Sequence, residues 1–181
     1  TLHSQYPKLI YAACSGFGKT GPDALRPAYD MVVQGLGGIM SLTGHPGAPP
    51  TRVGTSIGDI TAGLFTTIGI STALLYRSTS GKGMKIDVSM LDSQLAILEN
   101  ALARYFATGE VPGPLGARHP TIVPFQSYET SDGHIIIAAG NDPLFNTLCK
   151  TLECDSLSKD NRFDNNEARG KHIKELQTEF E

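Results

Sequence analysis

Asp59 is the residue whose neighbours in the sequence most clearly suggest a chemical role. It follows a polar, glycine-rich loop and opens a long apolar stretch that is predicted to be a helix buried on all sides, with the carboxylate facing inward. A carboxylate at a helix start can act as an N-cap, because it accepts hydrogen bonds from the free backbone N–H groups of the first turn. The same setting keeps it ionised, and an ionised carboxylate in a dry pocket can attack an acyl carbonyl. Position alone leaves both roles, cap and nucleophile, open.

Three other places carry groups suited to binding. The segment Ser15–Gly18 follows an apolar run and has the composition of a phosphate-binding loop, but its glycine spacing and the helix-stopping pair Gly21-Pro22 exclude the P-loop of nucleotide triphosphatases. Arg52, in the loop before Asp59, is either a cation that binds a substrate anion or a solvated loop residue. His119 lies in a Gly- and Pro-rich stretch and is either a catalytic or binding histidine or an exposed loop residue.

The composition describes a globular chain and excludes several partners. Its 181 residues are 40% hydrophobic and 18% charged, with a net charge of −3 and no run of Lys or Arg, which argues against nucleic acid or an anionic membrane surface as the main partner. Three cysteines without a CxxC pair predict neither a disulfide framework nor a zinc site, and no other metal site is predicted. A reducing, intracellular compartment is therefore expected. Thr and Gly interrupt the longest apolar stretch, so no membrane span is predicted.

The elements that must position these residues alternate between strand and helix. An apolar run and a run that alternates polar and apolar residues are predicted to be strands, and stretches with apolar residues at helical spacing are predicted to be helices. The strands are expected at 9–14 and 84–89, and the helices at 27–40, from 59 to about 77, and at 91–108. This order favours an α/β domain with a parallel core.

A second domain is predicted after the Gly- and Pro-rich stretch. Residues 126–130 and 135–139 flank the turn Ser131-Asp132-Gly133 and predict a hairpin, which a helix over 143–152 follows. The sequence has no initiator methionine and stops within an uncapped charged helix, so we expect a fragment of a longer chain. The expected organisation is 1–108 as part of a large α/β domain, 109–120 as a linker and 121–181 as the start of a smaller α+β domain.

Several short motifs, in this order, are similar to those of the class III coenzyme A transferases, the formyl-CoA and carnitine-CoA transferase family that also includes α-methylacyl-CoA racemase. The resemblance covers essentially the whole chain, and the motifs are specific in combination rather than singly. They occupy residues 10–18, 21–22, 26–30, 58–63, 79–90, 119–120, 124–126 and 130–133.

The resemblance implies roles for residues around the CoA thioester. The aspartate of the family's Gly-Asp-x-x-x-Gly motif attacks the donor thioester, which makes Asp59 the expected nucleophile. A position that lies along the cofactor in the family falls on Met90. The family's CoA-binding segment after the first strand falls on Ser15, Gly16, Phe17 and Gly18.

The resemblance also separates two branches of the family at Tyr29. The racemase branch has a histidine at this place and a glutamate near Asp142, and a tyrosine is a poor general base at neutral pH because its pKa is about 10. The transferase branch is therefore preferred, with Arg52, Tyr29 and His119 as candidate residues beside the substrate.

A fold, a reaction and an assembly follow from the same resemblance. The fold is a Rossmann-like, parallel-sheet large CoA-binding domain, present in part, with the start of a smaller α+β domain, in a family of interlocked homodimers. The reaction moves CoA from succinyl-CoA to a dicarboxylic acid such as glutarate or hydroxymethylglutarate, with the CoA thioester as substrate and no permanently bound cofactor. The mitochondrion is the expected location. The alternatives are a 2-methylacyl-CoA racemase and a CoA-binding or dimer-forming fragment without turnover.

Overall fold

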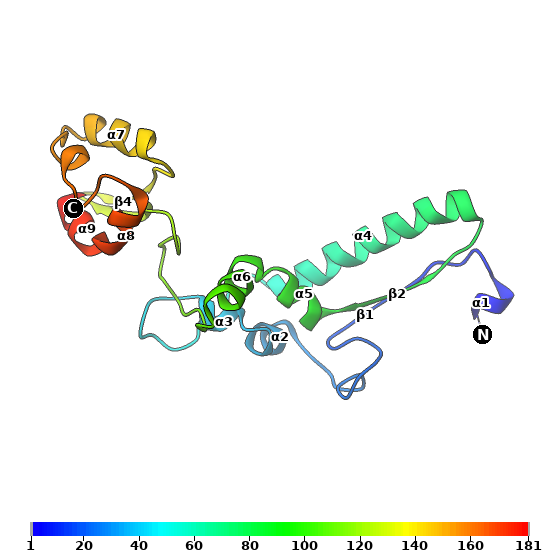
Figure 1. Ribbon diagram of the computed structural model, residues 1–181. Helices are drawn as coiled ribbons and strands as arrows, with labels where there is room; N and C mark the ends of the chain where they lie inside the picture. Colours follow the sequence, from blue (N-terminus) through cyan, green and yellow to red (C-terminus); the bar gives the residue numbers. More distant parts are fainter. Residues whose placement is uncertain (1, 181) are drawn as a thin grey trace. The chain divides into compact units, whose positions relative to one another are not determined.

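The computed structural model describes residues 2–180, which divide into two compact units between Pro114 and Leu115. Figure 1 shows the helices and strands of each unit. The elements of the first unit are α1 (Leu2–Gln5), β1 (Tyr11–Ser15), α2 (Asp30–Leu36), α3 (Ile39–Leu42), α4 (Ile57–Ser80), β2 (Lys85–Ser89), α5 (Met90–Ala96) and α6 (Glu99–Thr108). Those of the second are β3 (Phe125–Thr130), β4 (Gly133–Ala138), α7 (Asp142–Thr151), the 3-10 helix η1 (Leu157–Lys159), α8 (Asn166–Lys171) and α9 (Ile173–Phe180).

The first unit is built on two parallel strands joined by a helical crossover. β1 and β2 pair in register from Tyr11 opposite Lys85 to Ser15 opposite Ser89, which confirms the predicted parallel pairing. α4 packs against both strands, and Figure 1 shows it running alongside them with its first turn at the end where both strands finish. The carboxyl ends of the strands and the amino end of α4 therefore share one edge of the unit.

The prediction that α4 is buried on all sides is wrong for this chain. Four of its residues are buried, Gly58, Thr61, Ala62 and Ala73. Its larger apolar side chains are largely exposed, and these are Ile60, Leu64, Phe65, Ile68, Leu74, Leu75 and Tyr76. The reason is that β1, β2, α2 and α5 cover only part of the helix surface, so the apolar residues on its other faces stay exposed within the described chain.

The prediction of no membrane span concerns α4, the helix Ile57–Ser80. Its 24 residues are long and apolar enough to cross a bilayer by length and composition, despite the interrupting Thr and Gly residues. The core helix of an α/β protein meets the same two criteria. Within the described chain, α4 packs on strands and helices of its own unit.

Two predicted helices are each divided in the structure. The helix expected over 27–40 is α2 and α3, because Gly38 adopts a left-handed φ of 87° that a continuing helix does not allow. The helix expected over 91–108 is α5 and α6. The N–H groups of Ile97 and Leu98 donate to carbonyls three residues back, so the chain tightens there and starts again at Glu99.

The second unit has its own hydrophobic core. β3 and β4 form the predicted antiparallel hairpin, from Phe125 opposite Ala138 to Thr130 opposite Gly133. The helices that follow it supply most of a buried cluster, whose members are Val123, Phe145, Cys149, Leu157, Phe163 and Leu176. The charged helix expected from 166 onward is two short helices, α8 and α9.

Arg169, in α8, is fully buried at the centre of the second unit. Its guanidinium donates to the carbonyl oxygens of Val123 (2.8 Å) and Phe163 (3.0 Å) and to the Asp142 carboxylate (2.7 Å), and it lies 4.5 Å from the centre of the Phe145 ring. One side chain thus ties α8 to α7 and to the segment that precedes β3.

Candidate functional site

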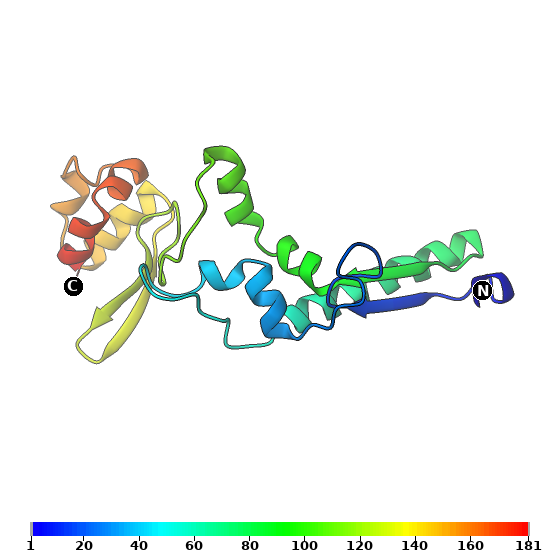
Figure 2. The same ribbon diagram turned by 90° about the horizontal axis from the view of Figure 1, so that it is seen from below.

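The candidate site lies where β1 and β2 end and α4 begins. Ser15 and Ser89 are direct partners at the carboxyl ends of the strands, and α5 starts at the next residue after β2. α2, α4 and α5 contact one another here (Figure 2). Between them lies a small buried cluster of Val33, Ala62 and Met90. Ligands of parallel α/β sheets ordinarily bind at this edge.

Asp59 is in the first turn of α4 but does not cap it. The helix starts at Ile57 with Ser56 as its N-cap, so Asp59 is the third helical residue. Its side chain is exposed, and no hydrogen bond or ion pair reaches its carboxylate from residues 2–180. The predicted N-cap role and inward orientation are therefore wrong, because the helix begins two residues earlier and turns the side chain to the surface of the unit.

The cap of α4 comes from α2 instead. The Asp30 carboxylate is buried and accepts a hydrogen bond from the backbone N–H of Gly58 through Oδ1 (2.8 Å). Its Oδ2 accepts from the Gln34 side chain (2.7 Å) and lies 4.0 Å from the Arg52 guanidinium. A carboxylate in this place compensates the positive end of the helix dipole.

Gln34 extends this hold to the loop that precedes α4. It is fully buried, its Oε1 accepts from the backbone N–H of Val53 (2.9 Å), and its Nε2 also donates to the Thr55 carbonyl (3.3 Å). Sequence reasoning missed both Asp30 and Gln34. The sequence contained a signal for both residues. They are four positions apart at the start of a helix, and Asp30 is the last residue of the motif at 26–30.

Thr61 and Gln94 also hold the first turn of α4. The Thr61 hydroxyl donates to the Ile57 carbonyl (2.7 Å) and accepts from the side chain of Gln94 in α5 (3.3 Å). Gln94 is fully buried, and its Oε1 has no partner within the described residues. The first turn of α4 is thus held by side chains from α2, α5 and α4 itself.

Gly58 has no space for a side chain. A Cβ at this position would lie 2.6 Å from Cγ2 of Val33 and 3.0 Å from Oδ1 of Asp30. The absent side chain is what allows α2 to approach the first turn of α4 closely enough for Asp30 to cap it.

The predicted CoA-binding segment Ser15–Gly18 comprises the last residue of β1 and the start of the loop that follows it. The Gly16 carbonyl accepts from the backbone N–H of Leu91, at the start of α5 (3.0 Å), and Gly18 has a left-handed φ of 78°. The Arg26 guanidinium lies 5.2 Å from the centre of the Phe17 ring, and the hydroxyl oxygen of Ser15 is buried without a partner among the described residues. The role of this segment in binding CoA stays a prediction.

Met90, Tyr29 and Arg52 differ in exposure. Met90 is buried in the cluster with Val33 and Ala62, so within this chain it is a core residue. Tyr29 directly precedes α2, and 82% of its surface is exposed. Arg52 is half-exposed beside Asp30, so its charge is partly engaged by the protein.

His119 belongs to the second unit and holds a turn there. Its Nδ1 accepts from the backbone N–H groups of Thr121 (3.2 Å) and Ile122 (3.0 Å), and its ring stacks on Phe125 with the ring centres 5.1 Å apart. Its own backbone N–H donates to the Phe125 carbonyl (2.8 Å). These contacts give His119 a structural role in the loop, and its predicted substrate role stays a prediction.

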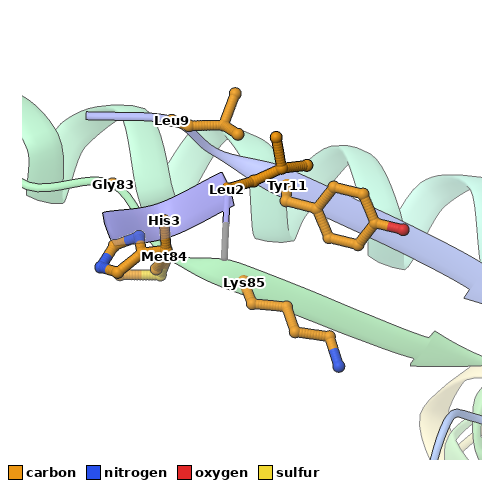
Figure 3. A pocket seen from close by; sticks show the side chains of 7 residues that line it. All are labelled: Leu2, His3, Leu9, Tyr11, Gly83, Met84 and Lys85. Carbon is orange, nitrogen blue, oxygen red and sulfur yellow. The ribbon is translucent and has the colours of Figure 1, made fainter. Parts of the chain in front are cut away.

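An apolar hollow of about 520 Å³ lies at the amino ends of β1 and β2, whereas the first turn of α4 lies at their carboxyl ends. Figure 3 shows the side chains that line it. Its lining comes from α1, from β1 and its preceding loop, and from β2 with the turn before it: Leu2, His3, Leu9, Tyr11, Gly83, Met84 and Lys85. None of the predicted site residues belongs to it, so it is separate from the candidate site.

Fold and site together define an α/β protein whose crossover helix carries, in its first turn, a carboxylate without a partner among residues 2–180, at the edge where parallel sheets bind ligands. The sequence model of CoA-transferase family III matches residues 1–181. The chain belongs to this family.

The similar proteins are CoA-transferases and a member of the CAIB/BAIF family. The chain is 49% identical over 164 residues to an acetyl-CoA:oxalate CoA-transferase of Acetobacter aceti, covering 90% of this chain and 42% of that protein. It is 41% identical over 170 residues to a succinate–glutarate CoA-transferase of Agrobacterium fabrum, covering 94% and 42%. A crystal structure of a CAIB/BAIF family protein from Brucella suis matches with a TM-score of 0.82 and 42% identity, covering 99% of this chain and 48% of that one. The chain thus spans about two fifths of the length of these curated relatives.

Proposed function

We propose that this chain is part of an acyl-CoA:carboxylate CoA-transferase in which Asp59 is the nucleophile. The observation that carries the proposal is that the first turn of α4 is capped by Asp30, which leaves the Asp59 carboxylate exposed and without a partner among residues 2–180. An exposed carboxylate at the ligand-binding edge of an α/β unit is the group that covalent acyl transfer requires.

The reaction divides into two exchanges at the Asp59 carboxylate. One oxygen of Asp59 attacks the thioester carbonyl of the donor, the C–S bond breaks, and the products are a mixed anhydride and the CoA thiolate. The thiolate then attacks the Asp59 carbonyl carbon, which gives an aspartyl-CoA thioester and releases the donor acid as its carboxylate. The acceptor carboxylate repeats the two steps in reverse order, which regenerates Asp59 and forms the new acyl-CoA.

A dicarboxylic acid is the proposed acceptor. The names of the two curated relatives above give oxalate for one and glutarate with succinate for the other, and all three are dicarboxylates. Glutarate or hydroxymethylglutarate with succinyl-CoA as donor is our first proposal, and the 49% identity to the first relative favours testing acetyl-CoA and oxalate beside them. Arg52, half-exposed near the start of α4, is a candidate partner for the second carboxylate.

The rest of the site and the assembly are proposed from the family. Ser15–Gly18 and Met90 are the proposed CoA contacts within a larger Rossmann-like domain, the subunit is proposed to form a homodimer, and the mitochondrion is the proposed location. No permanently bound cofactor is proposed, since the CoA thioester is itself the substrate. The remaining exposed faces of α4 fit this proposal, because further chain or a second subunit would cover them.

The racemase alternative has less support in the structure. Tyr29 is exposed where the racemases have a histidine, and Asp142, near the place of their glutamate, is paired with the buried Arg169. Neither residue is placed as a ready acid or base. Exchange of the C2 hydrogen of a 2-methylacyl-CoA in deuterium oxide would favour the racemase, and a chain without turnover or trapping would favour the binding-fragment alternative.

The test compares Asp59→Asn with Asp92→Asn in the complete protein. Asp92 is the matched control because it is an exposed acidic residue at the third position of α5, as Asp59 is in α4. Asp59→Asn should reduce turnover of succinyl-CoA or acetyl-CoA with dicarboxylates by at least about 10³-fold, while changing the free energy of unfolding by less than about 1 kcal/mol. Asp92→Asn should retain activity.

Chemical trapping identifies the nucleophile directly. Incubation with acyl-CoA and no acceptor, followed by hydroxylamine, should label the peptide that contains Asp59. Labelling of a different peptide, or normal turnover by Asp59→Asn, would show that the mechanism proposed here is wrong.

A further inference from the structure

We propose that Asp30, together with Gln34, is the positioning residue that fixes the first turn of α4 and so keeps the Asp59 carboxylate free for attack. This inference rests on the proposed function of Asp59. Both residues belong to α2. They act on the reaction by fixing the backbone of α4 and not by touching the substrate.

Two carboxylates at the start of α4 have separate tasks, since Asp30 caps the helix and Asp59 is the proposed nucleophile. In a capping box, the side chain of a Glu or Gln at the third helical position reaches back and accepts a hydrogen bond from the N-cap N–H. In α4 the N-cap Ser56 makes no side-chain cap bond, and the Gly58 N–H donates to Asp30 from α2. Asp59 therefore has no capping bond to break before it attacks a thioester.

The Asp30 cap on α4 is also held rigidly in place. Both oxygens of Asp30 are engaged by hydrogen-bond donors, and Gln34, which is fully enclosed, ties Asp30 to the backbone of Val53 and Thr55. Gly58 leaves no room for the turn to move closer to α2. The loop before Asp59 and the turn that carries it are thus fixed as one piece.

A rigid first turn of α4 matters for this reaction because it sets the position of the Asp59 carboxylate. Covalent attack needs the carboxylate oxygen held about 3–3.5 Å from the thioester carbon, and a displacement of about 1 Å can reduce the rate about 10²-fold. Asp59 has no partner of its own among the described residues, so its position depends on the backbone of the first turn. The contacts that fix this backbone are those of Asp30, Gln34 and Thr61.

The experiment measures the hydroxylamine-trapping rate at Asp59 in the complete protein, beside kcat and the dissociation constant of free CoA. Asp30→Ala should lower the trapping rate and kcat by about 10- to 100-fold. The dissociation constant of free CoA should stay unchanged, because the proposed CoA contacts lie in other elements. Asp30→Asn keeps an oxygen acceptor for the Gly58 N–H and should show a smaller loss than Asp30→Ala.

Asn165→Ala is the matched control for loss of a cap. Asn165 accepts from the Ala168 N–H (2.9 Å) at the start of α8 in the second unit, so this variant loses the same kind of bond away from α4. It should lower stability without changing the trapping rate. Gln34→Met preserves the side-chain volume and the Asp30–Gly58 bond but releases Val53 and Thr55, and it should also slow trapping.

The outcomes separate the inference from the proposed function. If the parent protein traps at Asp59 and Asp30→Ala traps equally fast, the inference is overturned and the proposed function stands. If Asp30→Ala loses CoA binding in proportion to kcat, the pair only stabilises the fold and the inference is overturned. If Asp30→Ala does not fold, Gln34→Met decides, and an unchanged trapping rate in that variant overturns the inference. If the parent traps elsewhere, the proposed function itself is wrong.

Discussion

Substituting Gly58 by alanine tests the close approach of α2 to α4, and Gly63→Ala provides the control within the same helix. Gly58 is buried, and a Cβ there would lie 2.6 Å from Val33 Cγ2, whereas a Cβ at Gly63 would meet no atom within 4 Å. Val33 is fully buried and cannot turn away without displacing its own neighbours. The two variants therefore differ in packing but share the same change of residue type.

The expected magnitudes follow from these distances. Alanine is favoured over glycine within a helix by about 1 kcal/mol, and Gly63→Ala should raise stability by about that amount. Gly58→Ala gains the same preference but adds an overpacking cost of about 1–3 kcal/mol. Because the helix preference cancels, the difference between the two variants measures the cost of forcing α2 and α4 apart, about 1–3 kcal/mol in favour of Gly63→Ala.

Urea denaturation of both variants in the complete protein measures this difference, and the trapping rate at Asp59 measures its effect on the site. Gly58→Ala should unfold at lower urea and trap more slowly, because displacement of α2 weakens the Asp30 cap. Equal stability of the two variants would refute the reasoning, since it would mean that the first turn of α4 is not held tightly against α2.

Two further predictions concern the second unit. Arg169→Met should lower the stability of this unit by about 2–4 kcal/mol, because the buried carbonyl oxygens of Val123 and Phe163 lose their donor and the half-exposed Asp142 loses its partner. Arg162→Met, at a half-exposed arginine paired with Asp160, should have a much smaller effect in the same unfolding assay. Burial and the neighbouring Cys154 raise the pKa of the Cys149 thiol to about 11, so in the unfolded chain this thiol ionises first and stability should fall as the pH rises from 9 towards 11. Cys149→Ala should lack this part of the decrease, and parallel pH profiles of the two proteins would contradict the assignment.

The sequence predicted the order and type of the main elements, because each carried a strong periodic pattern. The parallel pair β1–β2 and the hairpin β3–β4 lie within two residues of the expected positions. The breaks between α2 and α3 and between α5 and α6 were missed. A glycine such as Gly38 is tolerated in a helix or ends it, and the choice depends on tertiary contacts that periodicity does not contain.

The sequence predicted where Asp59 lies, and the role of this residue stays a prediction. Asp59 was singled out correctly as a residue at the start of α4, but a sequence pattern does not reveal which of two acidic residues supplies the cap. Asp30 lies 28 positions before its partner Gly58, so no local pattern connects them. The exposure of α4 was also missed, because an apolar helix indicates that a surface will be covered but not which part of the chain covers it.

The closed core of the second unit gives the two units different requirements during synthesis. Within residues 115–180 six buried apolar side chains form one cluster, and the buried Arg169 has its hydrogen-bond acceptors in the same unit. Within the described residues the first unit has two parallel strands and a largely exposed crossover helix, and such a sheet is stable only when further elements cover it. The second unit can therefore close its core as it is synthesised, whereas the first unit, which carries Asp59, depends on further elements that cover its strands and α4.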